Sequence, residues 1–330
     1  MKTVLITGGL GFVGSHLADR LAQEGCKLVL VDNLTTNVAA PEDYRNVCEV
    51  IVDSVENCQE RLSGYRFDEI YHLASHVGPA GVLQHAGEIA RATILTGDIA
   101  TKLALSQKSR LLLASTSEVY GQTGTLHEDI DCVVPSKYTV RLEYAAAKLT
   151  SEIAALNKAR VSDLFVNVVR PFNIAGPRQL PDGGFVLPRF VVAALNGTPL
   201  TVFGDGSQIR AFTDVRDIVA GLIAIMTGAK SNMVLNLGNP ANEVSILKLA
   251  QLVVQISGSR SDIELIDPKD LFGPLYEEGT ERVPDVEKAL SRLEWRPQFS
   301  LERTVSDTVE YFRSRPELLR TQPLETAASL

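Results

Sequence analysis

The stretch Thr3-Val4-Leu5-Ile6-Thr7-Gly8-Gly9-Leu10-Gly11-Phe12-Val13-Gly14 decides the fold of this chain. Its first half is a short apolar run typical of a buried strand, and a helical spacing of apolar residues begins after Gly14. Gly8, Gly11 and Gly14 lie between them with the spacing G-x-x-G-x-x-G. A strand, a glycine turn and a helix in this order predict a Rossmann-type unit, whose turn lets a pyrophosphate approach the backbone.

The next apolar run, residues 27–31, ends in Asp32. An acidic residue about 20 positions after the glycines is placed to hydrogen-bond a ribose diol. Residues 32–44 contain no Lys or Arg that could receive a 2′-phosphate, so the sequence predicts NAD rather than NADP. A simple turn residue before Asn33 is the alternative interpretation of Asp32.

Further strand-like runs follow, with helical patterns between most of them. The runs are residues 49–52, 69–73 and 110–114. This alternation predicts an α/β fold with a doubly wound, mostly parallel sheet. Ligands in such sheets lie beyond the carboxyl ends of the strands, and polar residues follow the runs there: Asp53, Ser75 and residues 115–118.

A helical pattern over residues 142–156 carries Tyr144 and Lys148. Four residues is just over one turn, so the phenol and the ammonium lie on the same helical face. A buried cation beside a phenol favours the phenolate and lowers its pKa, so the pair predicts a general base. Tyr and Lys at this spacing also occur by chance on helix surfaces, and the interpretation therefore depends on the rest of the chain.

The composition changes after residue 170, where proline and glycine become frequent and the strict alternation of strand and helix stops. A smaller C-terminal α/β lobe is predicted to begin here. The predicted NAD-binding Rossmann domain is residues 1–172, with 212–238 returning to it. The second lobe is predicted at residues 173–211 and 239–330. Ser245 and Ser300 each precede a helical pattern and are predicted to be N-caps.

Charge and composition argue against several classes of function. The 330 residues include 40 acidic and 32 basic side chains, a net charge of -8, without a basic run of five, so nucleic acid is not an expected partner. No apolar run reaches the ~20 residues that cross a bilayer, and no secretory signal precedes the first strand, which predicts a cytoplasmic protein without membrane contact. Four cysteines without C-x-x-C spacing and five histidines predict free thiols and no metal.

Taken together, the motifs resemble the extended short-chain dehydrogenase/reductases that act on nucleotide sugars, from residue 1 to about residue 313. The blocks that carry the resemblance are residues 7–14, 72–74, 170–173, 204–210 and 236–240. The resemblance implies a Rossmann fold, NAD as cofactor and a nucleotide sugar, most simply a UDP-sugar, as substrate. The expected cofactor-binding residues are Gly8, Gly11, Phe12, Val13, Gly14, Asp32, Asn33, Asp53, Ser54, Leu73, Ala74, Ser75, Tyr144 and Lys148.

The resemblance also implies catalytic and substrate-binding residues. The expected catalytic residues are Thr116, Ser117, Glu118, Tyr144, Lys148 and Arg282. The expected substrate-binding residues are Asn173, Arg189, Arg210, Tyr276 and Arg282, among which the guanidinium groups suit phosphate oxygens.

Residues 115–121, Ser-Thr-Ser-Glu-Val-Tyr-Gly, discriminate within this branch. Hexose 4,6-dehydratases of the family carry Asp-Glu after the Thr, whereas this chain has Ser117 before Glu118. The Ser-Glu pair is similar to that of UDP-glucuronate decarboxylases, as are residues 212–217 and the spacing of Tyr276 and Arg282. The resemblance therefore implies transient oxidation at C4 of UDP-glucuronate and decarboxylation to a UDP-pentose.

Three alternatives stay open. A UDP-sugar 4-epimerase uses the same Tyr144 and Thr116, and some 4-epimerases also carry Ser-Glu. A non-standard dehydratase would use Glu118 to remove the C5 proton. An NAD-binding regulator without activity is disfavoured by the intact Tyr144, Lys148 and Thr116.

Two departures from the family pattern concern the sugar pocket and the next helix. Residues 75–81 lack the tyrosine that decarboxylases place against the sugar, and the usual Asn-Val-x-Gly-Thr block is replaced near residues 96–98. The helices predicted near residues 86–107 and at Tyr144 lie on the outer layer of the sheet, where two subunits could pair. The sequence therefore predicts a homodimer whose sugar pocket differs in detail.

Overall fold

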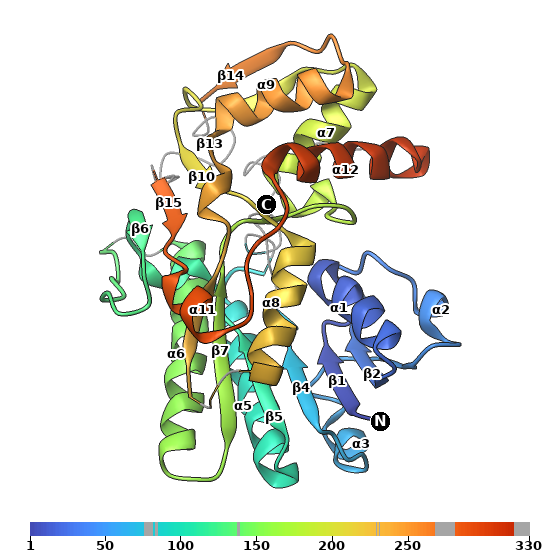
Figure 1. Cartoon of the computed structure of the whole chain (residues 1–330), viewed down its shortest axis with the longest axis vertical. Coiled ribbons are helices and arrows are strands. Elements are labelled where there is room, and N and C mark those ends of the chain that lie inside the picture. The colour runs from blue at the N-terminus through green and yellow to red at the C-terminus, as the bar shows by residue number, and fades with distance from the viewer. Residues whose placement is uncertain are drawn as a thin grey trace.

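A computed structural model describes residues 1–75, 82, 85–136, 139–228, 230, 232–267 and 281–319. A large sheet with helices on both faces forms one lobe, and a smaller lobe of helices and short strands lies beyond one end of it (Figure 1). The larger lobe contains the N-terminus, and the chain passes between the lobes more than once. The site described below lies where the strand ends of the large sheet face the small lobe.

The large sheet has seven strands, and every adjacent pair is parallel. In spatial order they are β12 (Val234–Leu237), β7 (Phe165–Pro171), β5 (Arg110–Ala114), β4 (Glu69–His72), β1 (Thr3–Thr7), β2 (Lys27–Asp32) and β3 (Glu49–Val52). The chain order reverses between β1 and β4, and ligands bind at such a switch point in open parallel sheets. The predicted doubly wound parallel sheet is confirmed.

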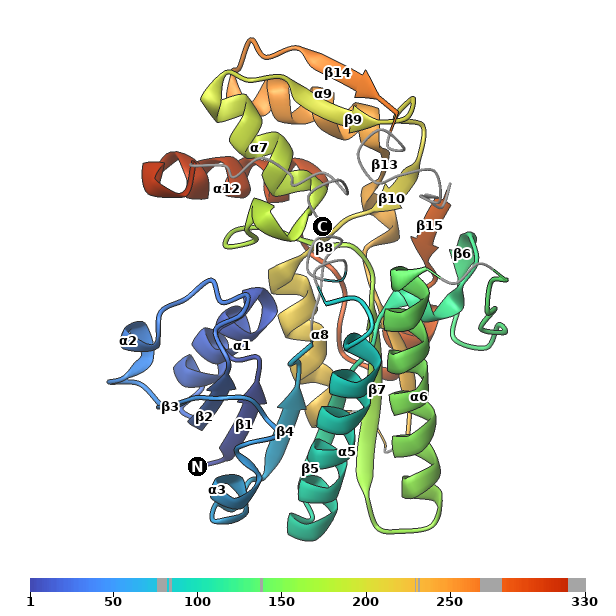
Figure 2. The same ribbon diagram turned by 180° about the vertical axis from the view of Figure 1, so that it is seen from behind.

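Helices cover both faces of this sheet, which explains why its strands are nearly continuous apolar runs. On one face lie α1 (Phe12–Gln23) and α8 (Val215–Gly228) (Figure 1), and on the other lie α5 (Ile89–Gln107) and α6 (Val140–Arg160) (Figure 2). Side chains alternate along a strand, so Val4 and Ile6 pack under α1 and α8, whereas Leu5 packs toward α5 and α6. Two short helices, α2 (Pro41–Tyr44) and α3 (Gln59–Ser63), precede and follow β3 in the chain.

The small lobe is built on a core of three helices, whose buried residues include Phe190, Leu249 and Val305. The helices are α7 (Val186–Asn196), α9 (Ile246–Ser257) and α12 (Leu301–Arg313). Ser245 accepts a hydrogen bond from the amide of Lys248, and Ser300 accepts one from the amide of Arg303, so both predicted N-caps are confirmed.

Short strands complete this lobe. A four-stranded sheet has the order β13 (Glu243–Ser245), β10 (Ile209–Ala211), β15 (Glu281–Pro284) and β6 (Gly124–Leu126). Two pairs are β14 (Ile263–Ile266) with β9 (Leu200–Phe203), and β11 (Thr213–Asp214) with β8 (Ile174–Ala175). The remaining elements are η1 (Ser117–Tyr120), η2 (Pro181–Gly183), η3 (Pro240–Asn242), α11 (Glu287–Arg292) and η4 (Pro316–Leu319). β6 was not predicted, and it brings a segment of the first half of the chain into the small lobe.

The chain returns to the large lobe twice. Residues 215–237, in α8 and β12, lie on the large sheet. Ala289, Leu293 and Trp295 pack in the core beneath α1 and α8, although the predicted division assigned them to the second lobe. The boundary between a cofactor domain and a substrate domain therefore stays a prediction.

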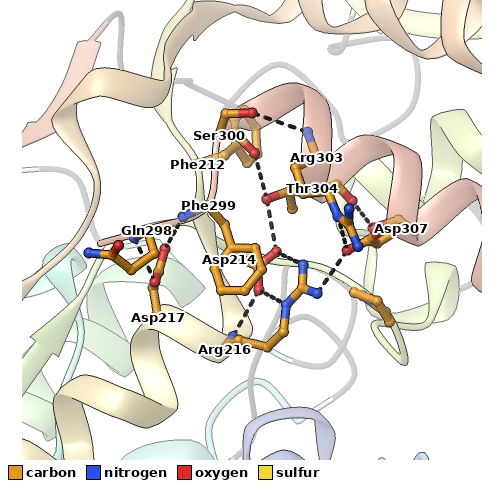
Figure 3. Close-up of polar contacts among 12 residues, drawn as sticks. Phe212, Asp214, Arg216, Asp217, Gln298, Phe299, Ser300, Arg303, Thr304 and Asp307 are labelled. Atoms are coloured by element: carbon orange, nitrogen blue, oxygen red, sulfur yellow. Dashed lines mark hydrogen bonds and ion pairs between the residues drawn. The ribbon is translucent and has the colours of Figure 1, made fainter. Parts of the chain in front are cut away.

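A cluster of polar contacts joins the start of α8 to α12, and we call Asp214, Arg216, Phe299, Thr304 and Asp307 the α8–α12 cluster (Figure 3). Asp214 is fully buried and accepts hydrogen bonds from Arg216 Nε at 2.8 Å, Arg216 Nη2 at 2.7 Å and Thr304 Oγ1 at 2.9 Å. Arg216 Nη1 lies 2.8 Å from Asp307, and its guanidinium lies 3.7 Å from the centroid of the Phe299 ring. The cluster fixes the first turn of α8 against the small lobe.

Candidate active site

The glycine turn connects β1 to α1 in the form that the sequence predicts. Gly8 has a φ of +69°, and its amide donates to the carbonyl of Val31 at 2.8 Å. A Cβ on Gly14 would lie 2.0 Å from the Gly8 carbonyl oxygen, so only glycine allows this approach of helix to strand. Gly11 is the N-cap of α1 without a side-chain cap, which leaves the first amides of the helix directed at the turn. This geometry fits a pyrophosphate.

Asp32 ends β2 beside the turn and is 7% exposed. Its Oδ2 accepts a hydrogen bond from the amide of Leu10 at 3.0 Å, and its Oδ1 accepts one from the amide of Leu34 at 2.9 Å. Each carboxylate oxygen has a further lone pair, so the side chain keeps acceptor capacity for a ribose hydroxyl. Asn33, which follows, is exposed, and its Oδ1 accepts from the amide of Thr35.

The other predicted cofactor residues lie at the same edge of the sheet. Asp53 follows β3, is exposed, and accepts from the amide of Ser54 at 2.7 Å. The amide of Ala74 donates to Thr7 Oγ1 at 3.2 Å. Phe12, Val13, Leu73 and Ser75 are all partly exposed there. The structure gathers these residues at the carboxyl ends of β1, β2, β3 and β4, and their contacts with a cofactor stay a prediction.

Tyr144, Lys148 and Thr116 are brought together by α6 and the end of β5. Thr139 caps α6, because its side chain accepts from the amide of Leu142. The Thr116 side chain lies beside the Tyr144 phenol and favours its ionised form. Lys148 is buried, and its Nζ donates to the carbonyl of Ala114 at 2.9 Å.

The spacing of Tyr144 and Lys148 predicts a lowered pKa for the phenol. This prediction is wrong, because the protein's own groups raise that pKa. Withdrawal of water around the phenol raises its pKa, and the negative charge of Glu118 raises it further, while the neighbouring Thr116 side chain opposes the shift. The Lys148 ammonium lies 6.0 Å from the centroid of the Tyr144 ring. Burial lowers the pKa of Lys148 to about 8, and Glu152 opposes this shift. The phenol therefore needs a further positive charge before it acts as a base near neutral pH.

Glu118 and Arg282 form an ion pair beside Tyr144, in which Arg282 Nη1 donates to Glu118 Oε1. Arg282 lies on β15 and is the Cα partner of Arg210 on β10, so the two arginines occupy one face of the small sheet. Burial raises the pKa of Glu118, but Arg282, Arg141 and Arg210 outweigh it and hold the pKa at about 2. Glu118 is therefore an anion at neutral pH and a weak base.

Two residues of the site were not predicted. Arg141 Nη2 lies 3.7 Å from Glu118 Oε1, and its position three residues before Tyr144 on the same helix is the signal that indicates it. His72 is buried with its Nδ1 2.9 Å from Thr7 Oγ1. Burial, and then the charge of Lys148, lower the pKa of His72 to about 3, so its imidazole is neutral.

The predicted substrate residues lie on several elements. Asn173 has a φ of +32°, and its Nδ2 donates to the carbonyl of Ala211 at 3.3 Å. Arg189 on α7 lies 4.7 Å from the centroid of the Phe203 ring, and Arg210 is buried. Ser117 is buried in the first position of η1. Tyr276 lies outside the described residues.

Within the part of the chain that the structure describes, no cluster of three or more His, Cys, Asp or Glu residues could hold a metal ion. None of the helices among those residues is long and apolar enough to span a membrane. The four cysteines are free thiols, as predicted, although only Cys58 is fully buried.

A glycine turn at a Rossmann switch point, with a Tyr and a Lys one helical turn apart beside a Thr, defines an extended short-chain dehydrogenase/reductase. Residues 4–238, more than half of the chain, match the NAD dependent epimerase/dehydratase family. The chain belongs to this family.

Known relatives give a finer comparison. UDP-glucuronic acid decarboxylase 1 of Xenopus tropicalis is 36% identical over 330 residues, which cover 96% of this chain and 73% of the relative. UDP-N-acetyl-alpha-D-glucosaminuronate decarboxylase of Bacillus cytotoxicus is 35% identical over 318 residues, which cover 94% of this chain and 98% of the relative. Among solved structures, UDP-glucose 4-epimerase of Thermotoga maritima with UDP-glucose aligns with a TM-score of 0.84 and 27% identity, over 94% of this chain and 99% of that one.

Proposed function

We propose that this protein is an NAD-dependent UDP-glucuronate decarboxylase, a lyase that makes a UDP-pentose. The observation that carries the proposal is the ion pair of Glu118 and Arg282 next to Tyr144 and Thr116. In this proposal the Arg282 guanidinium would face the C6 carboxylate of a uronic acid. The decarboxylases among the relatives support the same proposed activity.

The cofactor would be held by the glycine turn, by Asp32 and by Lys148, at the strand ends where these residues gather. When bound, NAD would supply the acceptor and then the donor of the hydride at C4, and its positive charge would favour the ionised form of the Tyr144 phenol. Tyr144 then takes the proton of the C4 hydroxyl, and Thr116 hydrogen-bonds the reacting oxygen. A ketone at C4 is β to the C6 carboxylate, so the C5–C6 bond breaks with its electron pair held as an enolate.

In this proposal, the residues around the C6 carboxylate act in the last steps of the reaction. After carbon dioxide has left, Arg282 assists the reprotonation of C5. Ser117 and Glu118 lie next to C5. Because Glu118 has a pKa of about 2, it is a poor base for removing the C5 proton, which disfavours the dehydratase alternative. Asn173, Arg189, Arg210 and Tyr276 are proposed to bind the nucleotide diphosphate end of the substrate.

The domain assignment and the quaternary structure belong to the same proposal. We assign NAD to residues 1–172 with 212–238, and the nucleotide sugar to residues 173–211 with 239–330. A homodimer through α5 and α6 is supported by their neighbouring position on the outer face of the sheet (Figure 2) and by exposed apolar side chains there, namely Ile94, Leu95 and Ile153. The cytoplasmic location stays a prediction from the sequence.

A UDP-sugar 4-epimerase, an isomerase, is the second candidate, favoured by the structural similarity to UDP-glucose 4-epimerase. One assay separates the candidates: the purified protein is incubated with UDP-glucuronate, and released carbon dioxide and the mass of the nucleotide sugar are measured. Loss of one carbon dioxide supports the proposal. An unchanged mass with a new sugar identifies an epimerase, and loss of one water identifies a dehydratase. A parallel incubation with UDP-N-acetylglucosaminuronate tests whether a decarboxylase prefers the acetamido sugar.

A further inference from the structure

Tyr144, Lys148 and Glu152 form a row along one face of α6, spaced by four residues, and we call them the α6 row. Each contacts the segment 114–116 at the end of β5. Tyr144 lies beside Thr116, Lys148 Nζ donates to the carbonyl of Ala114, and Glu152 Oε1 accepts from Ser115 Oγ. Three successive turns of the helix therefore face three successive residues at the strand end, and two of the turns are hydrogen-bonded to them.

Within the α6 row, Glu152 is held in place by an ion pair. Its side chain is 2% exposed, and it forms an ion pair with Arg170, whose Nη2 donates to Glu152 Oε2 at 2.6 Å and whose Nε lies 3.1 Å from Oε1. Arg170 belongs to β7, which pairs with β5, and the amide of Ser115 donates to the carbonyl of Val169 at 2.8 Å. One carboxylate thus joins α6, the end of β5 and β7.

The contacts continue beneath the turn that carries Glu118. The Arg170 guanidinium lies 4.8 Å from the centroid of the Tyr120 ring, and the Tyr120 hydroxyl donates to Asn236 Oδ1 at 2.7 Å. Tyr120 ends η1, the element that begins at Ser117. The ion pair of Glu152 and Arg170 therefore supports both segments that present catalytic candidates to the site.

Stability alone does not require this ion pair, because apolar residues of similar volume often replace buried ion pairs without loss of stability. Its position next to Lys148 gives it a further electrostatic effect. The ionisable groups that face Lys148 are Glu152 and Tyr144 on α6 and His72 on β4, and His72 is neutral. Glu152 is the one among these three that favours the ammonium form near neutral pH.

We infer that Glu152 is a positioning residue for the Tyr144–Lys148 pair, which sets the register of α6 on segment 114–116 and maintains the charge of Lys148. The inference rests on the proposed function, because it concerns the same oxidation at C4. It adds to that function a residue that touches neither sugar nor cofactor in the proposed site. A structural role alone would change stability without changing the pH dependence of the reaction.

The test compares wild type with Glu152→Gln and Glu152→Asp in the holoenzyme, by kcat and KM for UDP-glucuronate from neutral to alkaline pH. For Glu152→Gln we expect the alkaline limb of kcat to move down by about one pH unit, since Lys148 loses its proton earlier without the neighbouring carboxylate. KM should stay within about threefold. Glu152→Asp keeps the charge with a shorter reach, so the alkaline limb should return while kcat at neutral pH stays below wild type.

Thr304→Val is the matched control, because it removes a buried hydrogen bond to Asp214 in the α8–α12 cluster. It should lower the melting temperature and leave the pH profile of kcat in place. If Glu152→Gln does not fold, the double variant Glu152→Gln/Arg170→Met removes the unpaired guanidinium and should show a smaller shift in the same direction. An alkaline limb that stays at its wild-type position in the folded variants overturns the inference. Failure of wild type to react with any nucleotide sugar overturns the proposed function instead.

Discussion

Two clusters of arginine and carboxylate side chains differ in the balance of their charges. In the α8–α12 cluster, Arg216 bridges the fully buried Asp214 to Asp307, and Arg303 also pairs with Asp307, so two arginines meet two carboxylates. Around Glu118, three arginines act on one carboxylate whose side chain is 23% exposed. A cluster with matched charges holds elements together, whereas a cluster with an excess of positive charge is suited to receive an anion.

This difference changes how residues 212–217 are interpreted. The block was one basis of the resemblance to decarboxylases, yet its charged side chains bind the protein itself. Arg216 pairs with Asp214, and the carboxylate of Asp217 accepts from the amides of Gln298 and Phe299 at 2.8 and 3.0 Å (Figure 3). The charged side chains of residues 212–217 therefore join the two lobes. The identity of the substrate must be inferred from the residues around Glu118.

The largest effect is expected next to Glu118, at the phenol. Tyr144→Phe removes the proposed base, so kcat for UDP-glucuronate should fall by about 10³-fold. The melting temperature and the NAD content should stay near those of wild type. Tyr65→Phe, at the Glu49 contact far from the site, is the control and should keep full activity. Turnover of Tyr144→Phe within tenfold of wild type would contradict the assignment.

The second prediction sharpens the comparison at Glu118 itself. Glu118→Gln keeps the size of the side chain but removes the charge that faces the arginines, and kcat should fall by about 10²-fold. Because the Glu118 side chain is partly exposed, solvent screens the interactions that lower its pKa, and urea unfolding at neutral pH should show a loss of at most about 2 kcal/mol in the free energy of unfolding. A variant that loses stability and keeps activity would mean that the Glu118 cluster is structural.

The third prediction is the converse, in the α8–α12 cluster. Asp214→Asn leaves the Arg216 guanidinium short of a buried counter-charge, and the free energy of unfolding should fall by about 3 kcal/mol. At temperatures where the variant is folded, kcat should stay within about threefold of wild type. Urea unfolding and steady-state kinetics on the same preparation test this. A large loss of kcat in folded protein would give the cluster a part in the reaction.

The smallest effect is expected in the acid dependence of stability, where Glu118 and Asp217, a carboxylate next to the α8–α12 cluster, contribute with opposite signs. The pKa of Glu118 is lowered from 4.5 to about 2, so its contribution is present above pH 4.5 and is lost as pH falls toward 2. Burial raises the pKa of Asp217 from 3.8, so its contribution is complete below pH 3.8 and declines as pH rises through the raised value.

Unfolding of Glu118→Gln and Asp217→Asn across the acid range measures both slopes. Relative to wild type, Glu118→Gln should lose less stability on acidification, and Asp217→Asn should lose more. Equal slopes in the two variants would show that the two carboxylates do not differ as described.

Local patterns explain what could be predicted from the sequence. The glycine turn, the parallel sheet and the shared face of Tyr144 and Lys148 follow from spacing within a short stretch of chain. The pKa of Tyr144 could not be predicted, because withdrawal of water and the charge of Glu118 depend on tertiary packing. Nor could spacing show that Lys148 donates to the Ala114 carbonyl, or that the three residues of β6 pair with β15.

The four-stranded sheet of the small lobe has a consequence for synthesis. Its strands come from residues 124–126, 209–211, 243–245 and 281–284, so the sheet cannot close until the last of these has left the ribosome. By then every strand of the Rossmann sheet is already available for folding. Arg282 therefore reaches Glu118 only after all seven strands of the Rossmann sheet have been synthesised, so the ion pair of these two residues forms late.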